Sequence, residues 1–218
     1  MRQIMEDEIH YMLYGLPFYQ GKINPELFEK EKIIGTIKDN FLKQPIRDNW
    51  GKGEDYFITH SNFHHSYTDE ENVKMKKPDY TSLDKIYTEI ITKYVKIYCR
   101  DVKNFYYEVI NYTANNRESY LRPHNHHKID LSLIHYVGFN KQEHLPTIFL
   151  SPYFFADTIV QKQNFKKNSL SSWCYSEWMP DVQEDSFIVY PSILKHYVKC
   201  GNSNDLRITI VTNVKFNT

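Results

Sequence analysis

The stretch "RPHNHHKIDLSLIHYV", residues 122–137, joins a histidine cluster to a run of β-forming residues. His124, His126 and His127 fall within four positions, and the run that begins at Ile129 contains several β-branched and aromatic residues. In a strand, side chains two positions apart point to the same side, about 6.6 Å apart along the chain. His124 and His126 can therefore face one metal ion while His127 points away. The stretch predicts a strand that opens with two candidate metal ligands, and a solvated histidine-rich turn is the alternative.

Similar β-rich runs fill the second half of the chain. They are short, several alternate apolar and polar residues, and polar turns separate them. These runs are "NFYYEVINYTA" (104–114), "PTIFLSPY" (146–153), "DSFIVYPSI" (185–193) and "LRITIVTNVKF" (206–216). We expect residues 103–218 to form an all-β sandwich or barrel.

The first half is helical in character. Apolar residues at helical spacing predict helices at 24–43 and 81–101. The segment between them, 44–80, is rich in turn formers and charge, with one short strand expected at 56–59. Helices first and strands later predict an α+β chain of one domain, in which residues 1–102 are a helical support region with a long loop.

Composition excludes several classes of protein. The 218 residues contain 27 Lys plus Arg and 27 Asp plus Glu, so no net charge attracts a polyanion, and we expect no nucleic-acid binding. Cys99, Cys174 and Cys200 form no paired motif and favour a reducing compartment. The sequence shows neither a signal peptide nor a membrane span, and we expect a cytoplasmic protein. Its oligomeric state stays open, a homodimer included.

Two further residues extend the candidate site. His196 follows the strand run "SFIVYPS" by a short turn, and Arg207 begins a very apolar run eleven residues later. A buried arginine needs an anionic partner, and a ligand carboxylate would satisfy it through two hydrogen bonds. The alternative is a structural ion pair of Arg207 with Glu184, Asp185 or Asp205.

The third metal ligand is open between two residues. His126 is favoured by its spacing from His124. Asp130 has the same strand parity, but it would lie about 20 Å from His124 in an extended chain, so a local loop would have to bring it back.

The order of these motifs resembles the Fe(II)- and 2-oxoglutarate-dependent oxygenases, in particular a phage and bacterial branch distantly related to prolyl hydroxylases. The branch carries patterns like "HxHxxSGVYYV", "FxxP", "FPSWLxHxV" and "R-[IV]-S-[IL]-x-x-N". This chain has "PHNHHKIDLSLIHYV", "IFLSP", "DSFIVYPSILKHYV" and "RITIVTN" in the same order. The likeness covers residues 105–216 well and the N-terminal half weakly.

The resemblance implies a double-stranded β-helix, a jelly-roll barrel with flanking helices, and a set of site residues. His124, His126 and His196 would bind Fe(II), with Asp130 as the alternative to His126. Arg207 would hold the distal carboxylate of 2-oxoglutarate, Thr209 would add a hydroxyl, and Tyr120 and Tyr136 would line the cosubstrate pocket.

The sequence also departs from the pattern. Most of the superfamily has an HxD pair, whose aspartate completes a two-histidine, one-carboxylate iron site. This chain has His126 at the position of that aspartate. Asp185 stands where the branch has Gly, Leu133 replaces the Gly of "SGV", and Tyr190 replaces the Phe of "FPS".

The resemblance implies a dioxygenase that uses O2 to hydroxylate a C–H bond and releases succinate and CO2. An amino-acid or peptide side chain is the favoured substrate, by analogy, and the segments 44–80 and 156–181 are candidates for substrate recognition. Two alternatives remain: a three-histidine cupin-like metalloprotein that does not use 2-oxoglutarate, and a non-catalytic jelly-roll binding module.

Overall fold

The computed structural model describes residues 4–43, 57–58, 60–61, 76–117, 119–153, 176–199, 201 and 203–217. The described helices and strands are β1 (Met5–Leu13), β2 (Leu16–Ile23), η1 (Pro25–Leu27), α1 (Lys30–Lys43), β3 (Phe57–Ile58), β4 (His60–Ser61), α3 (Thr81–Tyr98), β5 (Asn104–Asn115), β6 (Tyr120–His124), β7 (Leu131–Gly138), β8 (Ile148–Leu150), β9 (Glu177–Trp178), β10 (Ser186–Pro191), β11 (His196–Val198) and β12 (Arg207–Asn217). The short strand expected at 56–59 corresponds to β3.

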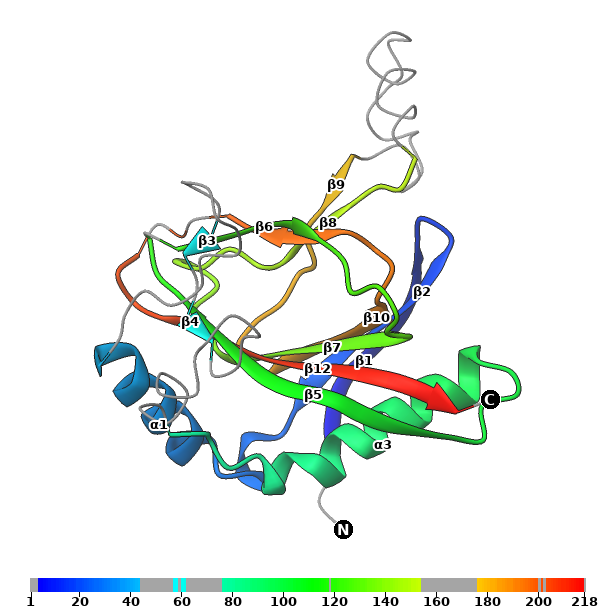
Figure 1. Ribbon diagram of the computed structural model, residues 1–218, viewed down its shortest axis with the longest axis horizontal. Coiled ribbons are helices and arrows are strands. Elements are labelled where there is room, and N and C mark those ends of the chain that lie inside the picture. The colour runs from blue at the N-terminus through cyan, green and yellow to red at the C-terminus, as the bar shows by residue number, and fades with distance from the viewer. Residues whose placement is uncertain are drawn as a thin grey trace, which may run out of the picture.

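The strands form two antiparallel sheets that face each other (Figure 1). The larger has the order β1-β2-β10-β7-β12-β5-β4 and the smaller the order β3-β6-β11-β8-β9. Helices α1 and α3 lie against the outer face of the larger sheet, on the side away from the smaller one (Figure 1). The predicted α+β class, a jelly-roll of strands with flanking helices, is confirmed, although the described strands do not close into a barrel.

Alternation along the strands gives the larger sheet two different faces. On β7, Leu131, Leu133 and Val137 pack into the apolar cluster under the helices. Ile134 and Tyr136 instead belong to a second cluster, which lies between the two sheets. We call these the helix face and the interior face, and the candidate site lies on the interior face.

The N-terminal segment adds two strands to the helices expected in residues 1–102. β1 and β2 form a hairpin whose loop is Tyr14 and Gly15, both with positive φ (53° and 78°). Two positive φ values are typical of the tight turns that match strand twist. β2 then pairs with β10, so this hairpin extends the larger sheet.

Both predicted helices are present, and each differs from the prediction at one end. The helix expected at 24–43 is divided, because Phe28 adopts an extended backbone (φ −142°) between η1 and α1 and packs its ring against His135. The helix expected at 81–101 begins at Thr81 as expected and ends at Tyr98, and the carboxylate of Asp79 accepts a hydrogen bond from the Thr81 N–H. Among the described residues, no helix combines the length and apolar character that crossing a bilayer requires.

Candidate metal centre

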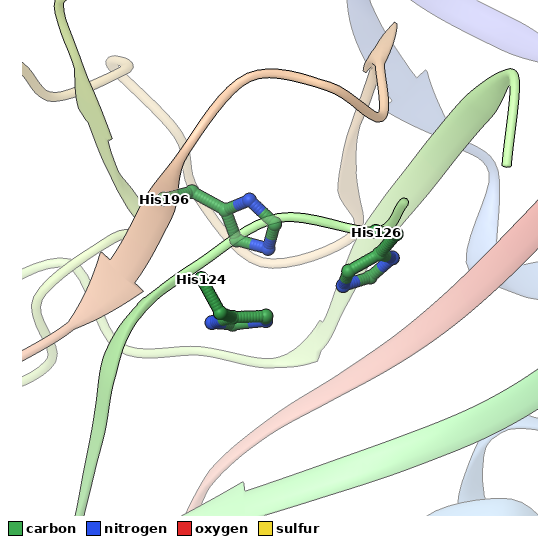
Figure 2. Close-up of side chains that lie close together, drawn as sticks. All are labelled: His124, His126 and His196. Atoms are coloured by element: carbon green, nitrogen blue, oxygen red, sulfur yellow. The ribbon is translucent and has the colours of Figure 1, made fainter. Parts of the chain in front are cut away.

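Three histidines from two neighbouring segments of the smaller sheet converge opposite the interior face of the larger sheet. His124 ends β6, His196 begins β11, and the two are directly paired across the strands. His126 follows two residues after β6. One ring nitrogen from each histidine lies within 4.8 Å of the others, and Figure 2 shows the three rings turned toward a common point. The structure therefore brings together the three histidines that the sequence singled out.

His126 reaches the cluster by a different route from the expected one. It lies in the turn after β6, where its backbone N–H donates to the carbonyl of Ser192 at 3.0 Å. The alternation of a strand is therefore not what aligns it with His124. This turn ties the β6–β7 connection to the β10–β11 connection, and it leaves His127 exposed, as expected.

Hydrogen bonds assign the same tautomer to all three rings. Nδ1 of His124 lies 2.9 Å from the carbonyl oxygen of Arg122, and Nδ1 of His196 lies 3.1 Å from the carbonyl oxygen of Leu194. Nδ1 of His126 lies 2.7 Å from Oδ1 of Asn213. These oxygens only accept hydrogen bonds, so each Nδ1 carries the proton and each Nε2 carries the lone pair. This arrangement orients metal-binding histidines in proteins.

Burial keeps the cluster neutral. Loss of solvent lowers the pKa of His124 to about 4 and also lowers the pKa of His126. Burial lowers the pKa of His196 well below its usual value, and charge on the other two histidines would lower it further. At neutral pH the three imidazoles are therefore unprotonated, the state that a metal requires.

A group of hydroxyl and amide side chains surrounds the histidines, and sequence reasoning missed it. Ser132 Oγ lies 3.2 Å from His126 Nδ1, 3.2 Å from Asn213 Oδ1 and 2.9 Å from Ser192 Oγ. The hydroxyl of Tyr190 lies 3.2 Å from Nε2 of His196. Ser132 lies an even number of positions from Tyr136 on β7, and Asn213 lies an even number from Arg207 on β12. Residues spaced in this way share one face of a strand, so this signal could have located Ser132 and Asn213.

Arg207 is buried at the start of β12, with 4% of its surface exposed. Its Nε donates to the carbonyl of Leu145 at 2.9 Å and its Nη2 to Oγ1 of Thr147 at 3.1 Å, while Nη1 has no hydrogen-bond partner among the residues that the structure describes. Within the described part of the chain it meets no carboxylate. Two of the acids considered as structural partners, Glu184 and Asp185, instead lie beside Lys30 on the helix face.

Asp185 also explains one departure from the family pattern. Its φ is 63°, the left-handed conformation that glycine adopts most easily. Aspartate tolerates this conformation better than most residues, and here both carboxylate oxygens accept hydrogen bonds from Lys30 Nζ, at 2.9 and 2.8 Å.

The predicted cosubstrate residues lie in different surroundings. Tyr136 is fully buried under the guanidinium of Arg207, whose Cζ lies 5.3 Å from the ring centre, and its hydroxyl accepts a hydrogen bond from the Thr147 N–H. Thr209 is buried two residues from Arg207 and shares a 2.8 Å hydrogen bond with Thr113. Tyr120 begins β6 and is half-buried.

Asp130 lies outside the histidine cluster. Its carboxylate accepts a hydrogen bond from the backbone N–H of Phe216 at 2.8 Å, near the end of β12, and its side chain is exposed. The geometry therefore gives the alternative third ligand a structural contact in place of a position beside His124.

Most of the two candidate recognition segments, 44–80 and 156–181, falls outside the described residues. Trp178, at the edge of the second segment, forms β9 and packs its ring against Phe18 and Phe149. This tryptophan therefore belongs to the interior packing.

Comparison with known proteins establishes the fold. No protein-family model and no curated protein matches the sequence. A prolyl hydroxylase from Trichoplax adhaerens, solved with a peptide of the hypoxia inducible factor oxygen degradation domain, superposes with a TM-score of 0.54 at 11% identity, covering 90% of this chain and 82% of that one. The non-heme alpha ketoglutarate dependent carbocyclase SnoK from nogalamycin biosynthesis gives 0.50 at 9% identity, covering 91% and 79%. AviO1 from Streptomyces viridochromogenes Tue57 gives 0.50 at 8% identity, covering 90% and 88%.

These matches define the class of fold. The chain has the fold of 2-oxoglutarate- and Fe(II)-dependent oxygenases, which confirms at the level of fold the resemblance seen in its motifs. At identities of 8–11% the likeness carries no activity with it. The function therefore has to be argued from the site.

Proposed function

We propose that the protein is an Fe(II)- and 2-oxoglutarate-dependent dioxygenase that hydroxylates a C–H bond and releases succinate and CO2. The observation that carries the proposal is Arg207, a buried cation whose Nη1 has no partner in the described part of the chain, in a fold that also gathers three neutral histidines between its two sheets. A buried, uncompensated guanidinium is costly, and a bidentate carboxylate is the partner that its geometry fits best.

The residues present fit both the metal and the cosubstrate. His124, His126 and His196 would hold Fe(II) through Nε2, with their Nδ1 hydrogen bonds fixing the rings. Arg207 would bind the distal carboxylate of 2-oxoglutarate, and the Thr209 hydroxyl lies on the same strand and the same face. Together with O2, the iron and cosubstrate would supply the oxidising chemistry.

Tyr136 would assist Arg207. Burial raises its pKa, so the phenol stays protonated at neutral pH. Its oxygen accepts from the Thr147 N–H, which leaves its own O–H to donate to a carboxylate. The apolar rings around it, such as Phe139 at 5.2 Å, would exclude water from this end of the site.

An amino-acid or peptide side chain is the substrate we favour. The support is the likeness of fold to the Trichoplax prolyl hydroxylase, which is solved with a peptide bound.

The test uses anaerobic spectroscopy on the purified full chain. Fe(II) and then 2-oxoglutarate are added, and the visible metal-to-ligand charge-transfer band is recorded for the parent and for His196→Ala, Arg207→Met and Lys215→Met. We expect no band in His196→Ala, and a band in Arg207→Met that needs at least about tenfold more 2-oxoglutarate, since a charge-assisted bidentate contact is lost. Lys215→Met removes a cation eight residues from Arg207 on the same strand and should match the parent in its need for 2-oxoglutarate.

Two results would contradict the proposed function. A folded parent that binds Fe(II) but shows no band with 2-oxoglutarate would favour a three-histidine metalloprotein that uses another cosubstrate. A parent that binds no Fe(II) would favour a binding module with the same fold.

A further inference from the structure

Tyr190 presents a hydroxyl to the histidine cluster from the opposite sheet. Its side chain is fully buried, and its oxygen lies 3.2 Å from Nε2 of His196. Because Nδ1 of His196 donates to the Leu194 carbonyl, Nε2 is the acceptor and the tyrosine O–H is the donor. Tyr190 therefore contacts the same nitrogen of His196 that would bind a metal.

The hydroxyl is held in place by the packing of its ring. Phe149 meets the Tyr190 ring edge-on with ring centres 4.8 Å apart, and Phe18 stacks on it at 5.9 Å. Burial also raises the pKa of Tyr190, so the oxygen keeps its proton. The motif that this chain resembles has phenylalanine at this position, so the hydroxyl is a specific feature of this sequence.

Metal binding would change the role of this donor. Once Nε2 of His196 gives its lone pair to a metal, it no longer accepts the hydrogen bond from Tyr190. A buried donor without an acceptor costs about 1–3 kcal/mol. Ser132 is also within hydrogen-bonding reach, but its Oγ already contacts Ser192, His126 and Asn213. Among the described residues this shared oxygen is the acceptor left to Tyr190, and a ligand bound to the metal beside His196 would give it an unshared acceptor.

The charge of the site indicates which kind of ligand this would be. Three neutral histidines compensate none of the charge of a divalent metal, and no carboxylate belongs to the cluster among the described residues. The groups around it, Ser132, Ser192, Asn213 and Tyr190, are also neutral. A buried dication in these surroundings favours an anion in its coordination shell.

We propose that Tyr190 is the hydrogen-bond donor that recognises a small anionic ligand bound to the metal next to His196. By binding this anion, Tyr190 would help the site to gain the negative charge that a carboxylate ligand would otherwise supply. The inference rests on metal binding by the three histidines, the first part of the proposed function, and it does not depend on 2-oxoglutarate.

The test uses Co(II) as a spectroscopic probe and azide as the anion. Parent, Tyr190→Phe and Tyr87→Phe are loaded with Co(II), its affinity is measured by calorimetry, and azide is titrated while the visible d–d bands are followed. Tyr190→Phe removes one oxygen and keeps the ring. Tyr87→Phe is the matched control, because the Tyr87 hydroxyl bonds His135 on the helix face in the same manner.

We expect Tyr190→Phe to bind Co(II) within about threefold of the parent and to bind azide about tenfold more weakly, the value of one hydrogen bond to a charged acceptor. Tyr87→Phe should match the parent in both measurements. Equal azide affinity in parent and Tyr190→Phe would overturn the inference and leave the proposed function intact. A difference in their Co(II) bands before azide is added would mean direct coordination by the phenol, which also overturns the donor role. Absence of Co(II) binding by the parent would overturn both proposals.

Discussion

Two tyrosine–histidine pairs are buried on opposite faces of the larger sheet. On the helix face, the Tyr87 hydroxyl lies 3.0 Å from Nδ1 of His135. On the interior face, the Tyr190 hydroxyl lies 3.2 Å from Nε2 of His196. Burial lowers the pKa of both histidines, to about 3 for His135 and well below the usual value for His196. Chemistry, burial and charge state are thus nearly the same in the two pairs.

Their neighbours differ, and that difference separates a site from a structural contact. His196 has two further histidine rings with centres 4.3 and 5.2 Å away, and its Nδ1 is held by a carbonyl. His135 packs against the rings of Phe28 and Tyr87; in the described part of the chain its Nε2 has no hydrogen-bond partner, and Asp185 lies 3.9 Å away. A lowered histidine pKa is therefore common to both pairs. The convergence of oriented lone pairs is what distinguishes the candidate metal centre.

The largest expected effect is a double dissociation between these two histidines. His196→Gln should lower the affinity for Co(II) or Zn(II) by more than about 100-fold, since losing a ligand exceeds the 10–100-fold that follows from losing a ligand's hydrogen-bond partner. His135→Gln should leave metal affinity within about threefold of the parent and lower the thermal unfolding midpoint instead. Calorimetric titration and thermal unfolding of each purified variant measure the two effects. Metal loss in both variants would mean that the two faces are coupled, which contradicts the comparison.

The next effect is the dependence of stability on pH. Burial lowers the pKa of His135 to about 3, from the 6.5 that is usual for histidine. Its neutral form stabilises the fold fully above pH 6.5, and this stability is lost as the pH falls toward 3, because the unfolded chain takes up the proton first. Between about pH 7.5 and about pH 5 the parent should lose about 2 kcal/mol more unfolding free energy than His135→Gln, which does not titrate.

Denaturant unfolding of metal-free parent and variant at the two pH values measures this difference. Lys30, Asp185 and Tyr87 face His135 and are present in both proteins, as is the interior cluster, so their contributions largely cancel. The raised pKa of Asp185 has the opposite sign, since protonation of that carboxyl becomes easier in the fold. Equal pH slopes in the two proteins would show that His135 takes up a proton within the native state.

The sequence predicted much of this arrangement because its signals are local. The β-rich runs correspond to β5, β7, β8, β10 and β12. Spacing selected His124 and His126, and positions next to predicted strands selected His196 and Arg207. Three features depended on contacts between distant residues. Phe28 interrupts a periodic helix in order to pack against His135, the N-terminal hairpin adds to β10, and the β6–β7 turn docks on Ser192 to bring in His126. No local sequence pattern predicts contacts between residues so far apart in the chain.

The smallest effect contrasts adjacent residues of β12. Asn213 faces the interior, where its Oδ1 accepts from His126. Thr212 is fully buried on the other side, and its hydroxyl has no partner among the described residues. Asn213→Ala should lower metal affinity about tenfold, the low end for such a partner, because Ser132 Oγ remains 3.2 Å from the same nitrogen. Thr212→Val should leave metal affinity unchanged and raise the free energy of unfolding by about 1 kcal/mol, since it replaces an unsatisfied buried hydroxyl with a methyl group.

Calorimetric titration with Co(II) and denaturant unfolding of both variants measure these effects. A metal effect from Thr212→Val equal to that of Asn213→Ala would show that affinity follows the packing of β12 as a whole. A loss confined to Asn213→Ala would locate the orienting interaction in a single hydrogen bond, on the face of the strand that His126 touches.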